Sequence, residues 1–83
     1  MNSVKAPLSL FPVPNTGNTV YCKGLRPDMS YIVALFDISG RQLNGASVDG
    51  NKINLPELRP GLYMMRIHNR QTGEEELLRY VQQ

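Results

Sequence analysis

An unbroken run of apolar residues, from Tyr31 to Phe36, constrains this 83-residue chain more than any other feature. The run is rich in β-branched and aromatic residues, which favour a strand over a helix. It stops at the segment DISGR (37–41), where Ser-Gly is typical of a turn and the Asp37 carboxylate can accept hydrogen bonds from the turn N–H groups. Because such a run would promote aggregation at a sheet edge, we expect it inside a sheet, as the first strand of a central hairpin.

Turn residues divide the rest of the chain into further short strands. They recur at about the 8–12-residue spacing that is typical of a β-sandwich. No segment has helical periodicity with capping residues. The pattern therefore predicts an all-β fold, an immunoglobulin-like antiparallel β-sandwich of about seven strands. Besides 31–36, we expect strands at 8–11, 19–23, 41–48 (bulged or broken at Asn44-Gly45), 52–55, 62–69 and 74–81.

Several residues are expected mainly to hold the shape. Two prolines after the first strand cannot donate to a ladder, so that strand should lie at an edge. Pro60-Gly61 suits a type II turn, and the tyrosine that follows is placed to form a tyrosine corner. The residues of this structural group are Pro12, Pro14, Asp37, Gly40, Arg41, Pro60, Gly61 and Tyr63.

Composition and spacing argue against several classes of function. The net charge of +2 is small and the basic residues form no cluster, so we expect no nucleic-acid partner. The single Cys22 excludes an internal disulfide, and His68 is the only histidine for a nucleophile–base pair. The glutamates at 74–76 alternate between sheet faces and cannot converge on one ion. We expect no catalytic residue, no metal and no cofactor.

Three sequence blocks together resemble the C-terminal sorting domain of proteins exported by the type IX (Por) secretion system of Bacteroidota. They are LFPVPN (10–15), LFDISGR (35–41), and a third block with INL (53–55), Leu58, PGLY (60–63), Arg66 and Ile67. Their order and spacing cover nearly the whole chain. Two positions depart from the family pattern: Val13 stands where an asparagine is usual, and Arg79 is the nearest basic residue to the usual lysine of the last strand.

The resemblance implies an export signal without catalytic activity, carried behind an N-terminal cargo domain. Residues 1–7 would be the end of a linker, and residues 8–83 the sorting domain. The implied partners are translocon components, namely an outer-membrane shuttle protein and a sortase-like peptidase that often removes the domain on surface attachment. The implied route runs through the periplasm to the outer membrane, the cell surface or the medium.

The last strand is the candidate recognition element. If it lies at an edge, its backbone groups can pair with a strand of the translocon. A homodimer through such an edge is also open, as is the alternative function of an immunoglobulin-like adhesion or ligand-binding module retained on its parent protein. The recognition candidates are Leu77, Leu78, Arg79, Tyr80, Val81, Gln82 and Gln83.

Overall fold

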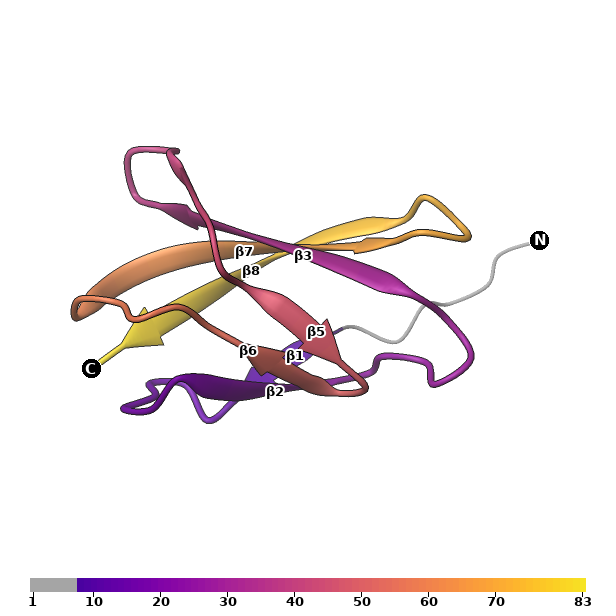
Figure 1. Ribbon diagram of the computed structural model, residues 1–83, viewed down its shortest axis with the longest axis horizontal. Coiled ribbons are helices and arrows are strands. Elements are labelled where there is room, and N and C mark those ends of the chain that lie inside the picture. Colours follow the sequence, from indigo (N-terminus) through magenta and orange to yellow (C-terminus); the bar gives the residue numbers. More distant parts are fainter. Residues whose placement is uncertain (1–7) are drawn as a thin grey trace.

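Eight strands form two four-stranded sheets in the computed structural model, which describes residues 8–83 (Figure 1). The linker end expected at residues 1–7 lies outside the described residues. Every described element is a strand, so the all-β prediction is confirmed. The strands are β1 (Ser9–Phe11), β2 (Thr19–Lys23), β3 (Tyr31–Asp37), β4 (Gln42–Leu43), β5 (Ser47–Asp49), β6 (Lys52–Asn54), β7 (Gly61–Asn69) and β8 (Glu75–Gln82).

The two sheets stack as the layers of a β-sandwich. The short sheet has the order β1-β2-β6-β5, the long sheet has the order β4-β3-β7-β8, and all neighbouring strands are antiparallel. Four successive hairpins supply these strands, and the chain passes to the other sheet after each hairpin. Figure 1 shows β3, β7 and β8 as one layer and β1, β2, β5 and β6 as the other. The sandwich expected from the turn spacing is therefore confirmed.

The strand expected at 41–48 is divided into two strands that belong to opposite sheets. β4 pairs with β3 in the long sheet, whereas β5 pairs with β6 in the short sheet. The chain crosses between them at Gly45, where φ is 105°. A Cβ at this position would lie 3.0 Å from the Cβ of Pro56. This division raises the strand number from about seven to eight.

The apolar run at residues 31–36 does lie inside a sheet. β3 is flanked by β4 and β7, which satisfies the expectation that it avoids an edge. The cover by β4 is partial, because β4 pairs only with Leu35 and Phe36. β7 pairs with β3 over its whole length, from Tyr31 to Asp37.

Alternating residues of both sheets fill the space between the layers. The long sheet contributes Leu35, Met65 and Tyr80, and the short sheet contributes Val20 and Ile53, each with none of its surface exposed. Removing these side chains from water is the main stabilising contribution, at about 25 cal/mol per Å² of apolar surface. The inward face expected for Tyr63, Met65 and Ile67 is confirmed.

Two turns differ in detail from the sequence expectations. β1 does lie at a sheet edge before Pro12 and Pro14, and both X–Pro peptide bonds are cis. The type II turn expected at Pro60-Gly61 is wrong. Gly61 is the first residue of β7 and has a φ of 156°, whereas the third residue of a type II turn needs a φ near 80°.

Candidate functional site

The last strand is the outermost strand of the long sheet. β8 pairs with β7 from Glu75 to Gln82, and no strand within residues 8–83 pairs with its other side. Six of the recognition candidates, residues 77–82, lie in β8, and Gln83 follows it. The edge position that the recognition hypothesis required is therefore present.

The C-terminal end of this edge is closed by one residue of the first loop. The backbone N–H of Asn15 donates to the Val81 carbonyl at 3.0 Å, and the Gln83 N–H donates to the Asn15 carbonyl at 2.8 Å. Asn15 thus forms a one-residue parallel bridge with Gln82. Within residues 8–83, the edge that remains open runs from Glu75 to Arg79.

The direction of the backbone groups along the open edge follows from this bridge. The Val81 carbonyl faces away from β7, because it accepts from Asn15. Inward and outward backbone groups alternate along an antiparallel ladder. The N–H and C=O groups of Arg79, Leu77 and Glu75 therefore also face away from β7. In the part of the chain that the structure describes, these donors and acceptors have no partner strand, as strand addition requires.

A buried polar network fixes the end of β8 to the first loop. The Asn15 amide nitrogen (Nδ2) donates to the Tyr80 hydroxyl at 3.1 Å and to the Thr19 carbonyl at 2.9 Å. The Tyr80 hydroxyl donates to Oε1 of Gln82 at 2.7 Å. Burial raises the pKa of Tyr80 above its ordinary value, so the hydroxyl stays protonated as a donor. Tyr80 and Gln82 are therefore held inside the molecule and offer no free surface to a partner.

The corner at Tyr63 connects this network to the middle of the sheet. The Tyr63 hydroxyl donates to the Arg59 carbonyl at 2.7 Å, the hydrogen bond that a tyrosine corner needs. Tyr63 stands opposite Tyr80 on β8 and opposite Asp37 on β3. Asp37, Tyr63 and Tyr80 therefore form one row across three strands, and Asn15 meets the row from the first loop.

The turn after β3 is held by the Asp37 carboxylate. Its Oδ1 accepts from the N–H groups of Ser39 and Arg41, both at 3.0 Å, and from the Ser39 hydroxyl at 2.6 Å. Nε of Arg41 lies 3.3 Å from Oδ2. The hydrogen bond from the Ser39 side chain, helped by the two N–H groups, lowers the pKa of Asp37 below its ordinary value. Gly40 follows with a φ of 89°, an angle that side chains disfavour.

The outer face of the long sheet carries exposed apolar side chains on three of its strands. Leu77 is 60% exposed on β8, Leu62 is 39% exposed on β7, and Ile32 is 49% exposed on β3. Outward positions of an antiparallel sandwich are ordinarily polar. The Arg66 guanidinium lies 5.3 Å from the centre of the Phe36 ring on the same face. This face combines exposed apolar side chains with arginines.

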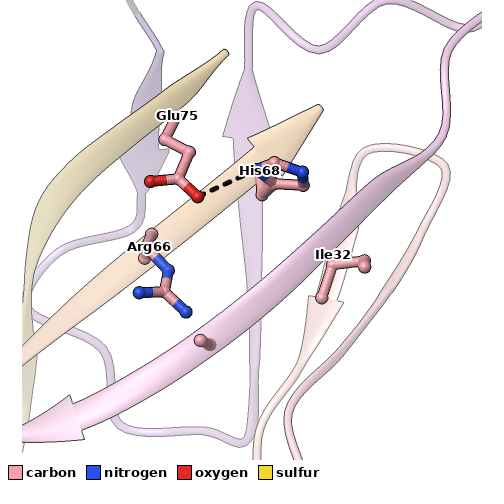
Figure 2. A pocket seen from close by; sticks show the side chains of 5 residues that line it. Ile32, Arg66, His68 and Glu75 are labelled. Atoms are coloured by element: carbon pink, nitrogen blue, oxygen red, sulfur yellow. Dashed lines mark hydrogen bonds and ion pairs between the residues drawn. The ribbon is translucent and has the colours of Figure 1, made fainter. Parts of the chain in front are cut away.

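A shallow hollow on this face is lined by residues of three neighbouring strands (Figure 2). His68 on β7 stands between Ile32 on β3 and Glu75 on β8. Nδ1 of His68 lies 2.9 Å from Oε2 of Glu75, the contact drawn as a dashed line in Figure 2. Arg66 extends beside this pair from the same strand as His68. The remaining lining residue is Ala34.

Within residues 8–83, neither a metal site nor an activated cysteine is present. No group of three His, Cys, Asp or Glu residues within 8–83 lies close enough to hold a metal ion. Cys22 is buried, and burial raises the pKa of its thiol to about 11. Its thiolate, the reactive form, is therefore scarce at neutral pH. No helix in the described part of the chain could span a membrane.

Sequence reasoning missed the part that Asn15 plays. The sequence identified Asn15 only as the last residue of the block LFPVPN (10–15), yet it is buried and contacts a strand 65 residues later. Its presence in the first block was the available signal. Gln82 was a candidate for recognition, but its side chain is buried.

The comparisons with known proteins give one match. A family model described as a secretion system C-terminal sorting domain matches residues 9–77. The match includes all three sequence blocks and ends within β8, so residues 78–83 lie beyond it. No curated protein and no solved structure matches the chain.

Proposed function

The chain belongs to the family of C-terminal sorting domains of the type IX secretion system, and we propose that it directs an attached cargo protein through the outer-membrane translocon of that system. Domains of this family are sorting signals and not catalysts. Such a signal is carried by a cargo protein and leads it to the cell surface or the medium. The finer steps that we propose are passage through the periplasm and capture by an outer-membrane shuttle protein.

The open edge of β8 is the observation that carries the proposal. Leu77 and Arg79 expose their side chains there, and their backbone groups face away from β7. A shuttle protein can therefore recognise this segment by adding a strand, without unfolding the sandwich. Leu78 and Tyr80 point inward and serve the core. We thus narrow the recognition candidates to Leu77, Arg79 and the backbone between them.

The row formed by Asp37, Tyr63 and Tyr80, together with Asn15, also supports this proposal. Asn15 comes from the first sequence block, and its amide donates to Tyr80. Tyr63, from the third block, stands opposite Tyr80 on β8 and opposite Asp37, from the second block, on β3. This arrangement holds the end of β8 in one register. A fixed register lets a partner read Leu77 and Arg79 at defined positions.

The removal of the domain is a second step that we propose. A sortase-like peptidase would cleave before the sandwich and join the cargo to the surface. Mass spectrometry of surface-attached cargo tests this step. Cargo that has lost residues 8–83 would support cleavage, and cargo that retains them would contradict it for this domain.

An export assay tests the function. The 83-residue chain is placed behind a signal peptide and a fluorescent reporter in a Bacteroidota host, with or without a working type IX translocon. We expect reporter at the surface or in the medium only when the translocon works. Reporter held in the periplasm of both hosts, with the domain folded, would contradict the proposal and favour a retained adhesion or ligand-binding module.

A further inference from the structure

The geometry of β8 points to a second copy of this chain as a partner. We propose that two copies pair through the open edges of their β8 strands, antiparallel, with Leu77 facing Leu77 across a two-fold axis. The result is one continuous eight-stranded sheet made from two long sheets. This inference concerns self-association and does not rest on the sorting role.

The open edge has the length and regularity that pairing requires. β8 spans eight residues, whereas the other edge strands of the two sheets, β1, β5 and β4, span three, three and two. Asn15 occupies only the end at Val81 to Gln83. The unpaired N–H and C=O groups of Glu75, Leu77 and Arg79 therefore form the longest open ladder within residues 8–83.

The side chains select one register for this pairing. In an antiparallel pair centred on Leu77, the residue two positions before it meets the residue two positions after it. Glu75 of one copy therefore stands opposite Arg79 of the other, and symmetry repeats the pair. Glu75, Leu77 and Arg79 all direct their backbone N–H and C=O groups away from β7. Each pair of facing residues would therefore exchange two N–H···O hydrogen bonds across the interface. Opposite charges at directly facing positions stabilise a sheet.

Neighbouring registers are disfavoured by the same residues. A pair centred on Glu75 would oppose two carboxylates, and a pair centred on Arg79 would oppose two guanidinium groups. Charged residues on an edge ordinarily discourage pairing with foreign strands. Here the two charges are four residues apart, on the same face and around an exposed leucine. The charges of Glu75 and Arg79 therefore repel most foreign strands, but they complement the same two charges on a second, antiparallel β8 strand.

Side chains on the outer face of the long sheet would also make contacts in this arrangement. Leu77, which is 60% exposed, would pack against its counterpart at the axis. The Glu75 carboxylate lies on the same outer face, with its Oε2 at 2.9 Å from Nδ1 of His68 (Figure 2). Arg79 of the second copy would approach it there. Only one strand from each copy contributes, so the interface is small and the association is expected to be weak and reversible.

Sedimentation equilibrium with charge-reversed variants tests the proposal. The 83-residue chain has a mass of 9.3 kDa, and we expect the average mass to rise towards twice that value with concentration. Glu75→Arg and Arg79→Glu each place like charges opposite one another. Each variant alone should associate about tenfold more weakly. An equimolar mixture of the two should form a heterodimer, because every facing pair is again of opposite sign.

Two further variants control for charge and for folding. Glu57→Arg makes the same charge change at an exposed position in the connection from β6 to β7, and it should associate like the wild type. Leu77→Lys places two ammonium groups at the axis without touching the core, and it should be monomeric. Circular dichroism of each variant reports whether the sandwich is intact.

Three results would overturn the proposal. The first is a wild-type mass of 9.3 kDa up to about 1 mM, the weak end of measurable affinity. The second is unchanged association of Leu77→Lys. The third is the absence of a heterodimer in the mixture of two folded variants. None of these results bears on the export assay, which measures translocation and not mass.

Discussion

The amide of Asn15 donates a 3.1 Å hydrogen bond to the hydroxyl of Tyr80, joining the first loop to the last strand across 65 residues of sequence. The backbone of Asn15 pairs with Val81 and Gln83 at the same place. One residue therefore both closes the end of the edge strand and satisfies a buried hydroxyl. This contact gives the first sequence block a structural role, and among the described residues it leaves the segment from Glu75 to Arg79 without a partner strand.

Replacing Asn15 by alanine should destabilise the sandwich by about 1–3 kcal/mol, because the buried Tyr80 hydroxyl loses its donor and the Thr19 carbonyl loses a partner. Urea unfolding measures the change. Asn18→Ala, in the same loop but exposed, is the matched control and should shift stability by less than about 0.5 kcal/mol. Equal effects of the two substitutions would contradict the role given to Asn15.

Tyr80→Phe should also cost about 1–3 kcal/mol, because the oxygen Oε1 of Gln82 then lacks the hydroxyl donor. Combined with Asn15→Ala, it should be less destabilising than the sum of the two single changes, since both remove the same hydrogen bond. A double-mutant cycle in urea measures this coupling. Strict additivity would show that Asn15 and Tyr80 do not interact in solution.

Tyr63→Phe should cost about 0.5–1.5 kcal/mol, because it removes the hydrogen bond to the Arg59 carbonyl and keeps the buried ring. Thermal unfolding is a sufficient measurement. Tyr21→Phe, on a tyrosine that is 39% exposed, serves as the control and should leave the midpoint nearly unchanged. If the hydrogen bond from Tyr63 to Arg59 does not stabilise the fold, both variants will have the same unfolding midpoint.

Asp37→Asn should change how stability depends on pH. The hydrogen bonds from Ser39 and Arg41 lower the pKa of Asp37 in the folded chain below its ordinary value of 3.8. The ionised Asp37 carboxylate therefore stabilises the fold above pH 3.8. This contribution is lost as the pH falls through the lower pKa that Asp37 has in the folded chain. The stability difference between wild type and variant should shrink over that interval. Asp49→Asn, at the exposed end of β5, is the comparison, and a difference independent of pH would refute the prediction.

Gly45→Ala should destabilise by about 1–3 kcal/mol, because φ is 105° and the new Cβ would lie 3.0 Å from Pro56. Gly50→Ala separates the two causes. Gly50 also has a positive φ, of 64°, but no atom lies within 4 Å of the added Cβ. The substitution at Gly45 should therefore be the more harmful of the two in urea unfolding.

Features that depend on neighbouring residues in the sequence could be predicted, and long-range pairings could not. Alternation identified the inward residues of β7, and the spacing of turn residues identified the sandwich. The break at Gly45 was visible, but the assignment of its two halves to opposite sheets depends on which strands lie alongside them. Likewise, the place of Asn15 in the first sequence block marks the residue but does not reveal that it binds the last strand.

The recognition candidates on the edge strand β8 could be predicted only in part. The sequence indicated a strand at 74–81, with recognition candidates at every position from Leu77 to Gln83. The structure divides them, because inward residues serve the core and Asn15 covers the end. That division depends on the register with β7, which local sequence does not determine.

The most direct test of the account replaces exposed residues of the open β8 edge in the export assay. Leu77→Gln combined with Arg79→Glu changes only exposed side chains of the open edge, and Arg26→Glu in the loop after β2 makes the same charge change away from that edge. With the sandwich shown to be folded, we predict that the double variant stays in the periplasm and that the control reaches the surface. Export of the double variant at the wild-type level would contradict recognition through this edge.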